Sequence, residues 1–153
     1  MLDLAKVLML SSSRQGDEPY LYHAKAMIEA HLNGIEKVLF IPFAGVSLNW
    51  DAYTAKVQEA LPEITVTGIH QQDDAEKAVN NAQAILVGGG NTFNLLNEIY
   101  RQNLFKAIQQ RVVSGMPYIG WSAGSNLCGL SIKTSNDMPI IQPQSFSTFG
   151  FIN

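Results

Sequence analysis

Residues 116–124 read Met116-Pro-Tyr-Ile-Gly-Trp-Ser-Ala-Gly124, an apolar run that ends in a cluster of small residues. A short apolar run closed by serine and glycine is typical of a buried strand that turns sharply into a helix. The segment therefore predicts a β-strand over residues 116–121, followed by a helix that begins just after Ser122 and ends at about Leu130.

The same alternation of strand and helix continues toward the N-terminus. Short apolar or β-branched runs predict further strands over residues 6–11, 37–41, 64–69 and 84–87. Apolar residues at helical spacing predict helices over residues 19–33, 49–61, 73–82, 92–100 and 104–113. Regular alternation with short connections predicts an α/β fold with a doubly wound, mostly parallel sheet, whose ligand site lies beyond the carboxyl ends of the strands.

Composition limits the class of protein. Of the 153 residues 46% are hydrophobic and only 15% are charged, which suits a single α/β domain over residues 1–153. The formal charge of −3 comes from interspersed acids and bases, which disfavours nucleic acid as a partner. No apolar run is long enough for a membrane span or a signal peptide, so we expect no membrane partner. The one cysteine, Cys128, is expected in the core, and a cytoplasmic location is the simplest expectation.

Gly120-Trp-Ser-Ala-Gly124 has the G-x-S-x-G spacing of a nucleophile elbow. Between a strand and a helix, such a turn pushes the serine hydroxyl toward solvent, and small neighbours permit the strained backbone. Ser122 is therefore the candidate nucleophile, with the amide of Ala123 directed at a developing oxyanion. The alternative is a plain structural turn.

Gly88-Gly-Gly-Asn91 follows the predicted strand over residues 84–87, at the same end of the sheet as Ser122. Glycines allow backbone amides to converge on a negative charge, so Gly89, Gly90 and Asn91 are candidates for the oxyanion hole and substrate binding. The alternative is a turn that only lets strand and helix pack closely.

A serine nucleophile needs a base, and the chain has three histidines. His23 and His31 fall inside the first predicted helix. His70 ends the third predicted strand on the site side of the sheet, so it is the one internal candidate, although a structural loop histidine is the simpler interpretation.

Ser11-Ser-Ser-Arg-Gln-Gly16, after the first predicted strand, favours a different function. Flavodoxin-like proteins gather hydroxyls and amides around a phosphate at this position. A non-catalytic module that binds anions or nucleotides is therefore the alternative to an enzyme, although no complete nucleotide-binding glycine motif accompanies the loop.

Several motifs together resemble one family. Ile41-Pro-Phe-Ala-Gly-Val46, Val87-Gly-Gly-Gly-Asn-Thr-Phe93, Gly120-Trp-Ser-Ala-Gly124 and Asn136-Asp-Met-Pro-Ile140 are similar, in order and spacing, to the peptidase E family of α-aspartyl dipeptidases. The resemblance extends over the whole chain, and Trp121 favours peptidase E over the related cyanophycinases.

The resemblance implies a cytoplasmic serine peptidase with a fold similar to class I glutamine amidotransferases. Its substrate would be a small peptide, Asp-Xaa, and neither metal nor cofactor is implied. Ser122 matches the family's nucleophile, and the amides around Gly89, Gly90 and Ala123 match its oxyanion hole. Asn136 and Asp137 match a shared motif to which we assign no role.

One departure from the family pattern concerns the base. In the family a catalytic histidine follows the elbow in an Asn-Pro-His-Phe type segment and a carboxylate comes later, whereas this chain stops at Ile152-Asn153. We therefore expect the domain to be truncated at its C-terminus and, lacking the histidine and acid of the triad, to be inactive alone. Missing strands would expose apolar surface and a sheet edge, which would favour homo-oligomers. If His70 completes the site instead, the chain would be active.

Overall fold

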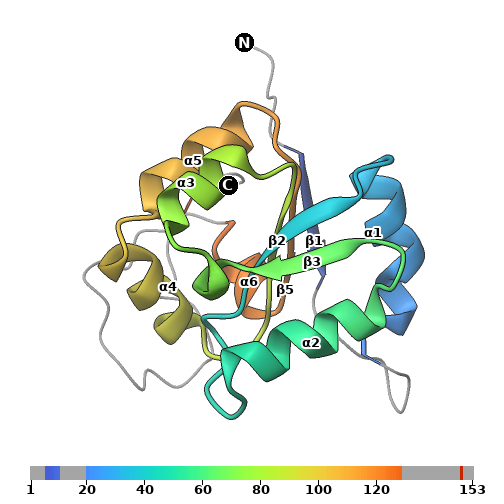
Figure 1. Ribbon diagram of the computed structural model, residues 1–153, viewed down its shortest axis with the longest axis horizontal. Helices are drawn as coiled ribbons and strands as arrows, with labels where there is room; N and C mark the ends of the chain where they lie inside the picture. The colour runs from blue at the N-terminus through green and yellow to red at the C-terminus, as the bar shows by residue number, and fades with distance from the viewer. Residues whose placement is uncertain (1–5, 11–19, 129–148, 150–153) are drawn as a thin grey trace.

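The computed structural model describes residues 6–10, 20–128 and 149. Within these residues a sheet of five strands runs through the centre of the molecule, in the order β1-β5-β4-β2-β3 (Figure 1). The strands are β1 (Val7–Leu10), β2 (Lys37–Ile41), β3 (Thr65–Gly68), β4 (Ile85–Val87) and β5 (Tyr118–Trp121). Every pairing is parallel, which confirms the predicted α/β fold.

The register brings the carboxyl ends of the strands to one edge of the sheet. Ile41 is paired with Val87, Val87 with Gly120, and Leu10 with Trp121. The loop after β4 and the turn after β5 therefore start side by side, because β4 and β5 are adjacent strands.

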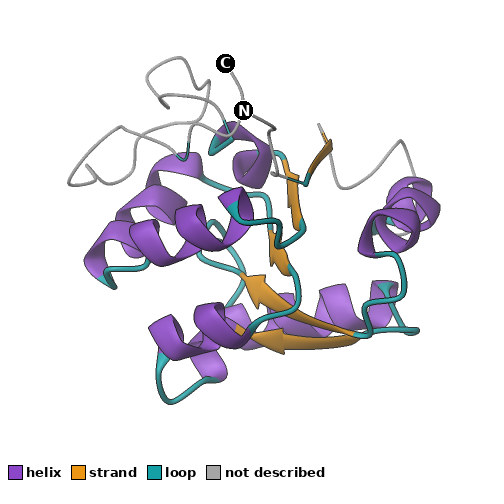
Figure 2. Cartoon of the chain, turned by 90° about the horizontal axis from the view of Figure 1, so that it is seen from above, coloured by secondary structure: helices purple, strands orange, loops and turns teal. Residues whose placement is uncertain are grey.

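The helices lie on both sides of the sheet (Figure 2). They are η1 (Tyr22–Ala24), α1 (Lys25–Leu32), α2 (Trp50–Ala60), η2 (Ile69–Gln71), α3 (Ala75–Asn81), α4 (Thr92–Arg101), α5 (Phe105–Val113) and α6 (Ala123–Asn126). Asn49, Asp74 and Asn91 cap α2, α3 and α4, each accepting a hydrogen bond from a backbone amide of the first turn. The prediction that the last helix ends at about Leu130 is wrong at residues 127 and 128, which form a turn after α6 ends at Asn126. Residues 129–148 lie outside the described residues.

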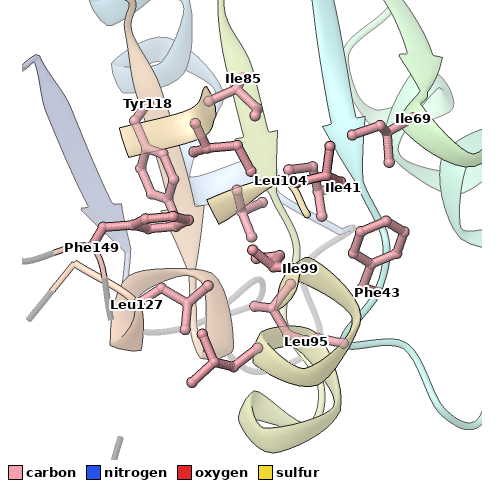
Figure 3. Packing of buried hydrophobic residues seen from close by; sticks show 14 of the residues in the cluster. Ile41, Phe43, Ile69, Ile85, Leu95, Ile99, Leu104, Tyr118, Leu127 and Phe149 are labelled. Atoms are coloured by element: carbon pink, nitrogen blue, oxygen red, sulfur yellow. The ribbon is translucent and has the colours of Figure 1, made fainter. Parts of the chain in front are cut away.

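One apolar core lies on each side of the sheet, between the sheet and the helices that cover it. One core joins the sheet to α1 and α2, and the other joins it to α3, α4, α5 and α6. Figure 3 shows part of the second core, where Tyr118 of β5 and Phe149 face each other. Cys128 is fully buried in this second core, as the sequence predicts.

The described helices are short: the longest, α2, has 11 residues. None of the helices in the described ranges has the length and apolar character that a bilayer span requires.

Candidate active site

Ser122 lies in a strained turn between β5 and α6. Its backbone angles are φ 51° and ψ −112°, outside the conformations that a non-glycine residue usually adopts. The glycines at either side are sterically required: a Cβ on Gly120 would lie 2.6 Å from the carbonyl carbon of Gly124, and one on Gly124 would overlap the carbonyl of Val87. This is the elbow that the G-x-S-x-G spacing predicts.

Hydrogen bonds to β1 and β5 support the strained turn. The amide of Ser122 donates to the carbonyl oxygen of Leu10 over 2.9 Å. The hydroxyl oxygen of Ser125 lies 2.7 Å from the same oxygen and 2.8 Å from that of Gly120. The elbow is thus tied to two neighbouring strands, as a backbone outlier of this kind needs.

The glycine loop after β4 lies directly against the serine. A Cβ on Gly89 would lie only 2.9 Å from the Cβ of Ser122. Gly90 has a φ of 138°, and a Cβ there would overlap the carbonyl of Ala44. Both positions therefore require glycine, because of the close approach at Gly89 and the positive φ at Gly90.

The amides of this loop have two different uses. Gly88 donates to the carbonyl of Ile41 and Asn91 to that of Ala44, so the Asn91 amide is occupied. The side chain of Asn91 caps α4. By contrast, no backbone–backbone hydrogen bond among the described residues uses the amide of Gly89, Gly90 or Ala123. Such amides next to a strained serine can donate hydrogen bonds to a developing negative charge.

A cavity of about 220 Å³ opens at Ser122. It is lined by residues of the loops after β2 and β4, of α2 and of the segment before α1: Tyr20, Gly45, Val46, Ser47, Leu48, Tyr53, Lys56, Gly89, Gly90 and Ser122. The side chains of Tyr20, Tyr53 and Lys56 were not among the sequence candidates. Tyr53 and Lys56 could have been found from the sequence, because they are three residues apart and so lie on one face of a helix that starts at the site end of the sheet.

Larger hollows lie elsewhere and do not include Ser122. One of about 560 Å³ lies between the start of β2 and α3, and one of about 520 Å³ lies beside Trp50 and His70. Size alone is a poor guide here, because neither hollow contains a nucleophile next to amide donors. The smaller cavity at Ser122 is therefore the candidate active site.

His70 does not reach this cavity. Its Nε2 lies 2.7 Å from Oδ1 of Asp51, and the same oxygen accepts a hydrogen bond from Gln71. Two hydrogen bonds lower the pKa of Asp51: the one from Gln71 has the larger effect, and the one from His70 the smaller. His70 follows β3, three strand positions from β5, which corresponds to roughly 14 Å. The hypothesis that His70 completes the site is therefore wrong for this geometry.

The other two histidines, which are not candidates for the base, lie in and next to the first helix. Nε2 of His31 lies 3.2 Å from the carbonyl oxygen of Lys6, and His23 is in η1. No histidine is among the described residues that line the cavity. The described ranges also contain no group of three metal-ligating side chains. The loop over residues 11–16 and the motif at Asn136 and Asp137 lie outside the described residues.

Solved structures support the fold. A putative peptidase E protein from Listeria monocytogenes EGD-e matches 96% of this chain and 75% of its own, with a TM-score of 0.73 and 20% identity. A peptidase from an acI-B1 Actinobacterium matches 98% of this chain and 66% of its own, with a TM-score of 0.67 and 18% identity. At these identities the likeness concerns the fold alone.

Sequence relatives are much more similar. Proteins named Peptidase E from Shewanella oneidensis and Shewanella putrefaciens are 52% and 51% identical over 147 residues, which are 95% of this chain. The matched stretch spans 62% of the length of these relatives. The model of peptidase family S51 matches residues 7–153, which include the elbow and the glycine loop. The resemblance read from the motifs is thereby confirmed, and the chain belongs to peptidase family S51.

Proposed function

We propose that this chain carries the nucleophile and oxyanion hole of a serine peptidase that hydrolyses dipeptides with an N-terminal aspartate. One observation supports this proposal. Ser122 has a strained backbone and packs against the loop of Gly89 and Gly90, and the backbone amides of Gly89, Gly90 and Ala123 make no backbone–backbone hydrogen bond among the described residues. The substrate class follows from membership of the family and from relatives named Peptidase E.

In the proposed reaction, Oγ of Ser122 bonds to the carbonyl carbon of the Asp-Xaa peptide bond. The carbonyl oxygen becomes an oxyanion that accepts hydrogen bonds from the amides of Ala123 and of Gly89 or Gly90. The C–N bond then breaks, and the amine leaves with the proton of the serine hydroxyl. Water hydrolyses the ester and releases aspartate. Loss of one such donor costs about 3 kcal/mol of transition-state stabilisation.

The proton of Ser122 needs an acceptor, and we propose that none of the three histidines of this chain is that acceptor. All three histidines are described, and the residues lining the cavity include none of them. A serine protease without its base keeps only the residual catalysis of the oxyanion hole and binding. We therefore expect this chain by itself to turn over substrate slowly or not at all.

The positive charge of Lys56 favours a substrate with an acidic side chain. Among the described residues that line the cavity, it is the one with a charged side chain. Its Nζ lies 4.5 Å from the centroid of the Tyr20 ring, a cation–π contact that holds the ammonium near the cavity. The side-chain carboxylate of an N-terminal aspartate is the group that this charge would attract.

The proposal includes no metal or cofactor, because a serine and amide donors suffice for acyl transfer. It places the reaction in the cytoplasm, in keeping with a single cysteine.

Two measurements test the proposal. Mass spectrometry after reaction with a fluorophosphonate should place one adduct on Ser122, absent in Ser122→Ala and retained in Ser114→Ala, an exposed serine at the end of α5. Hydrolysis of aspartyl p-nitroanilide should be slow and should depend on Ser122 but not on His70. An equal adduct yield in Ser122→Ala would show that Ser122 is not the nucleophile. A melting temperature raised by flavin mononucleotide, with no adduct, would favour the binding module.

A further inference from the structure

We infer that the Tyr53 hydroxyl sets the direction of the Gly90 amide, and so acts as a positioning residue for the oxyanion hole. The inference rests on the proposed function, since it concerns the same site. Tyr53 itself is expected to touch neither the reacting atoms nor the leaving group.

The first step is a hydrogen bond from α2 to the glycine loop. The Tyr53 hydroxyl donates to the carbonyl oxygen of Gly89 over 2.9 Å. Carbonyl 89 and amide 90 belong to one planar trans peptide, in which C=O and N–H point in opposite directions. A bond that holds the carbonyl toward α2 therefore holds the amide of Gly90 away from α2.

The second step is the packing of the Tyr53 ring, which leaves it little freedom. Tyr53 is only 6% exposed, and its ring meets that of Phe40 edge-on at 5.0 Å between centroids. A Cβ on Gly45 would lie 2.8 Å from the ring, and one on Gly88 would lie 2.5 Å from the hydroxyl. The tyrosine thus fills the space between the loops after β2 and β4.

The third step is a relay that reaches the elbow. The indole Nε1 of Trp121 donates to the Tyr20 hydroxyl over 2.8 Å, and the Tyr20 hydroxyl donates to that of Tyr53 over 3.0 Å. Trp121 directly precedes Ser122. One chain of hydrogen bonds therefore connects the residue before the nucleophile to the peptide that carries the Gly90 amide.

The direction of this relay depends on Tyr53 keeping its proton. Burial raises the pKa of Tyr53 well above its ordinary value, so its hydroxyl remains a donor across the working range of a serine peptidase. Phenylalanine at position 53 would keep the ring and remove only the donor. Tyr53→Phe is therefore the informative variant.

The test uses the chain as it is, with two readouts. The first is the reaction of Ser122 with a fluorophosphonate, separated into an affinity and a maximal rate constant. Tyr53→Phe should lower the rate constant by about 10- to 100-fold, because small misplacements of catalytic groups have effects of this size, and should leave the affinity nearly unchanged. Tyr20→Phe should give a smaller fall, since Tyr53 can still donate to Gly89.

The second readout is the backbone amide resonance of Gly90 in the chain labelled with ¹⁵N-glycine. Tyr53→Phe should move or broaden this resonance and leave those of Gly34 and Gly115 unchanged. Tyr22→Phe is the matched control, because Tyr22 is 64% exposed and does not line the cavity. Melting curves would show that each variant is folded.

The outcomes separate this inference from the proposed function. If Ser122 is labelled and Tyr53→Phe reacts as fast as the parent chain, the positioning role is overturned and the nucleophile stands. If Ser122 is labelled neither in the parent chain nor in its variants, the proposed function fails. The Gly90 resonance alone then decides whether Tyr53 holds the peptide group between Gly89 and Gly90. An unmoved resonance then overturns the inference.

Discussion

The Tyr118 hydroxyl donates a 2.6 Å hydrogen bond to the carbonyl oxygen of Gly124. Tyr118 opens β5 and Gly124 lies in the first turn of α6, so this bond closes the strand, the elbow and the helix into one unit. Complete burial raises the pKa of Tyr118 well above its ordinary value, and the hydroxyl therefore stays protonated.

Tyr118→Phe should destabilise the fold by about 1–2 kcal/mol, because it leaves the carbonyl of Gly124 buried without its strong donor. The Cys128 sulfur, 3.9 Å from the same oxygen, is too weak a donor to replace it. The midpoint of urea unfolding would measure the loss. Tyr22→Phe, at an exposed tyrosine, should leave the midpoint unchanged, and equal midpoints for both variants would contradict the argument.

Lys56→Met should weaken the binding of an aspartyl dipeptide by roughly 5- to 30-fold, which corresponds to about 1–2 kcal/mol for one attractive charge at partial exposure. Titration calorimetry in a Ser122→Ala background avoids hydrolysis. The matched ligand is the asparaginyl dipeptide, whose neutral side chain should bind equally well with lysine or methionine. Lys77→Met, on α3 outside the cavity, is the control variant. A loss that is the same for both dipeptides would show that Lys56 does not read the charge.

The strands and the elbow were predictable because their signals are local. Residues 38–41 form a contiguous apolar run, and the strand predicted over residues 37–41 has the same bounds as β2. The G-x-S-x-G turn is equally local, since the backbone of Gly124 occupies the space that a Cβ on Gly120 would need.

The rest of the site was not predictable, because it depends on strand order. Tyr20 and Trp121 are 101 residues apart in the chain and meet only because β1 and β5 are neighbours. The start of the first helix was also wrong: it was predicted at Pro19, whereas η1 begins at Tyr22. Leu21 adopts a left-handed conformation with φ 61° and is fully buried, so tertiary packing outweighs the local helical pattern there.

Cys128 should react slowly with iodoacetamide in the folded protein. Burial raises the pKa of its thiol to about 12, and the thiolate is the reactive form. Little thiolate therefore exists at pH 8–9, whereas the unfolded chain titrates near the ordinary value of 9.0. The rate should rise steeply in urea and follow the fraction of unfolded chain. As the only cysteine, it makes the readout by mass unambiguous. Rapid alkylation in buffer at pH 8 would contradict the burial.

The last prediction concerns β3, which lies at the edge of the sheet with one side unpaired by any described strand. Side-chain amides make hydrogen bonds with the backbone groups on this unpaired side of β3. Gln58 of α2 donates to the carbonyl of Ile64 over 2.7 Å and accepts from the amide of Val66 over 2.9 Å. Gln71 accepts from the amide of Gly68 over 3.1 Å. The Gln58 amide thus makes the two bonds that a neighbouring strand would make, which blocks edge-to-edge pairing.

Gln58→Glu should destabilise the fold at pH 7, because a carboxylate oxygen would face the carbonyl of Ile64 in place of an amide donor. Protonation restores a donor, so the folded state raises the pKa of the introduced carboxyl group, and the lost stability should return as the pH falls toward about 4. Gln58→Ala should lose stability at every pH and should self-associate more than the parent chain in sedimentation velocity, since the edge amide of Val66 becomes available. Gln110→Ala, at an exposed glutamine of α5, controls for the loss of a helical glutamine. If Gln58→Ala self-associates no more than the parent chain and is as stable as Gln110→Ala, the edge of β3 is protected by something other than Gln58.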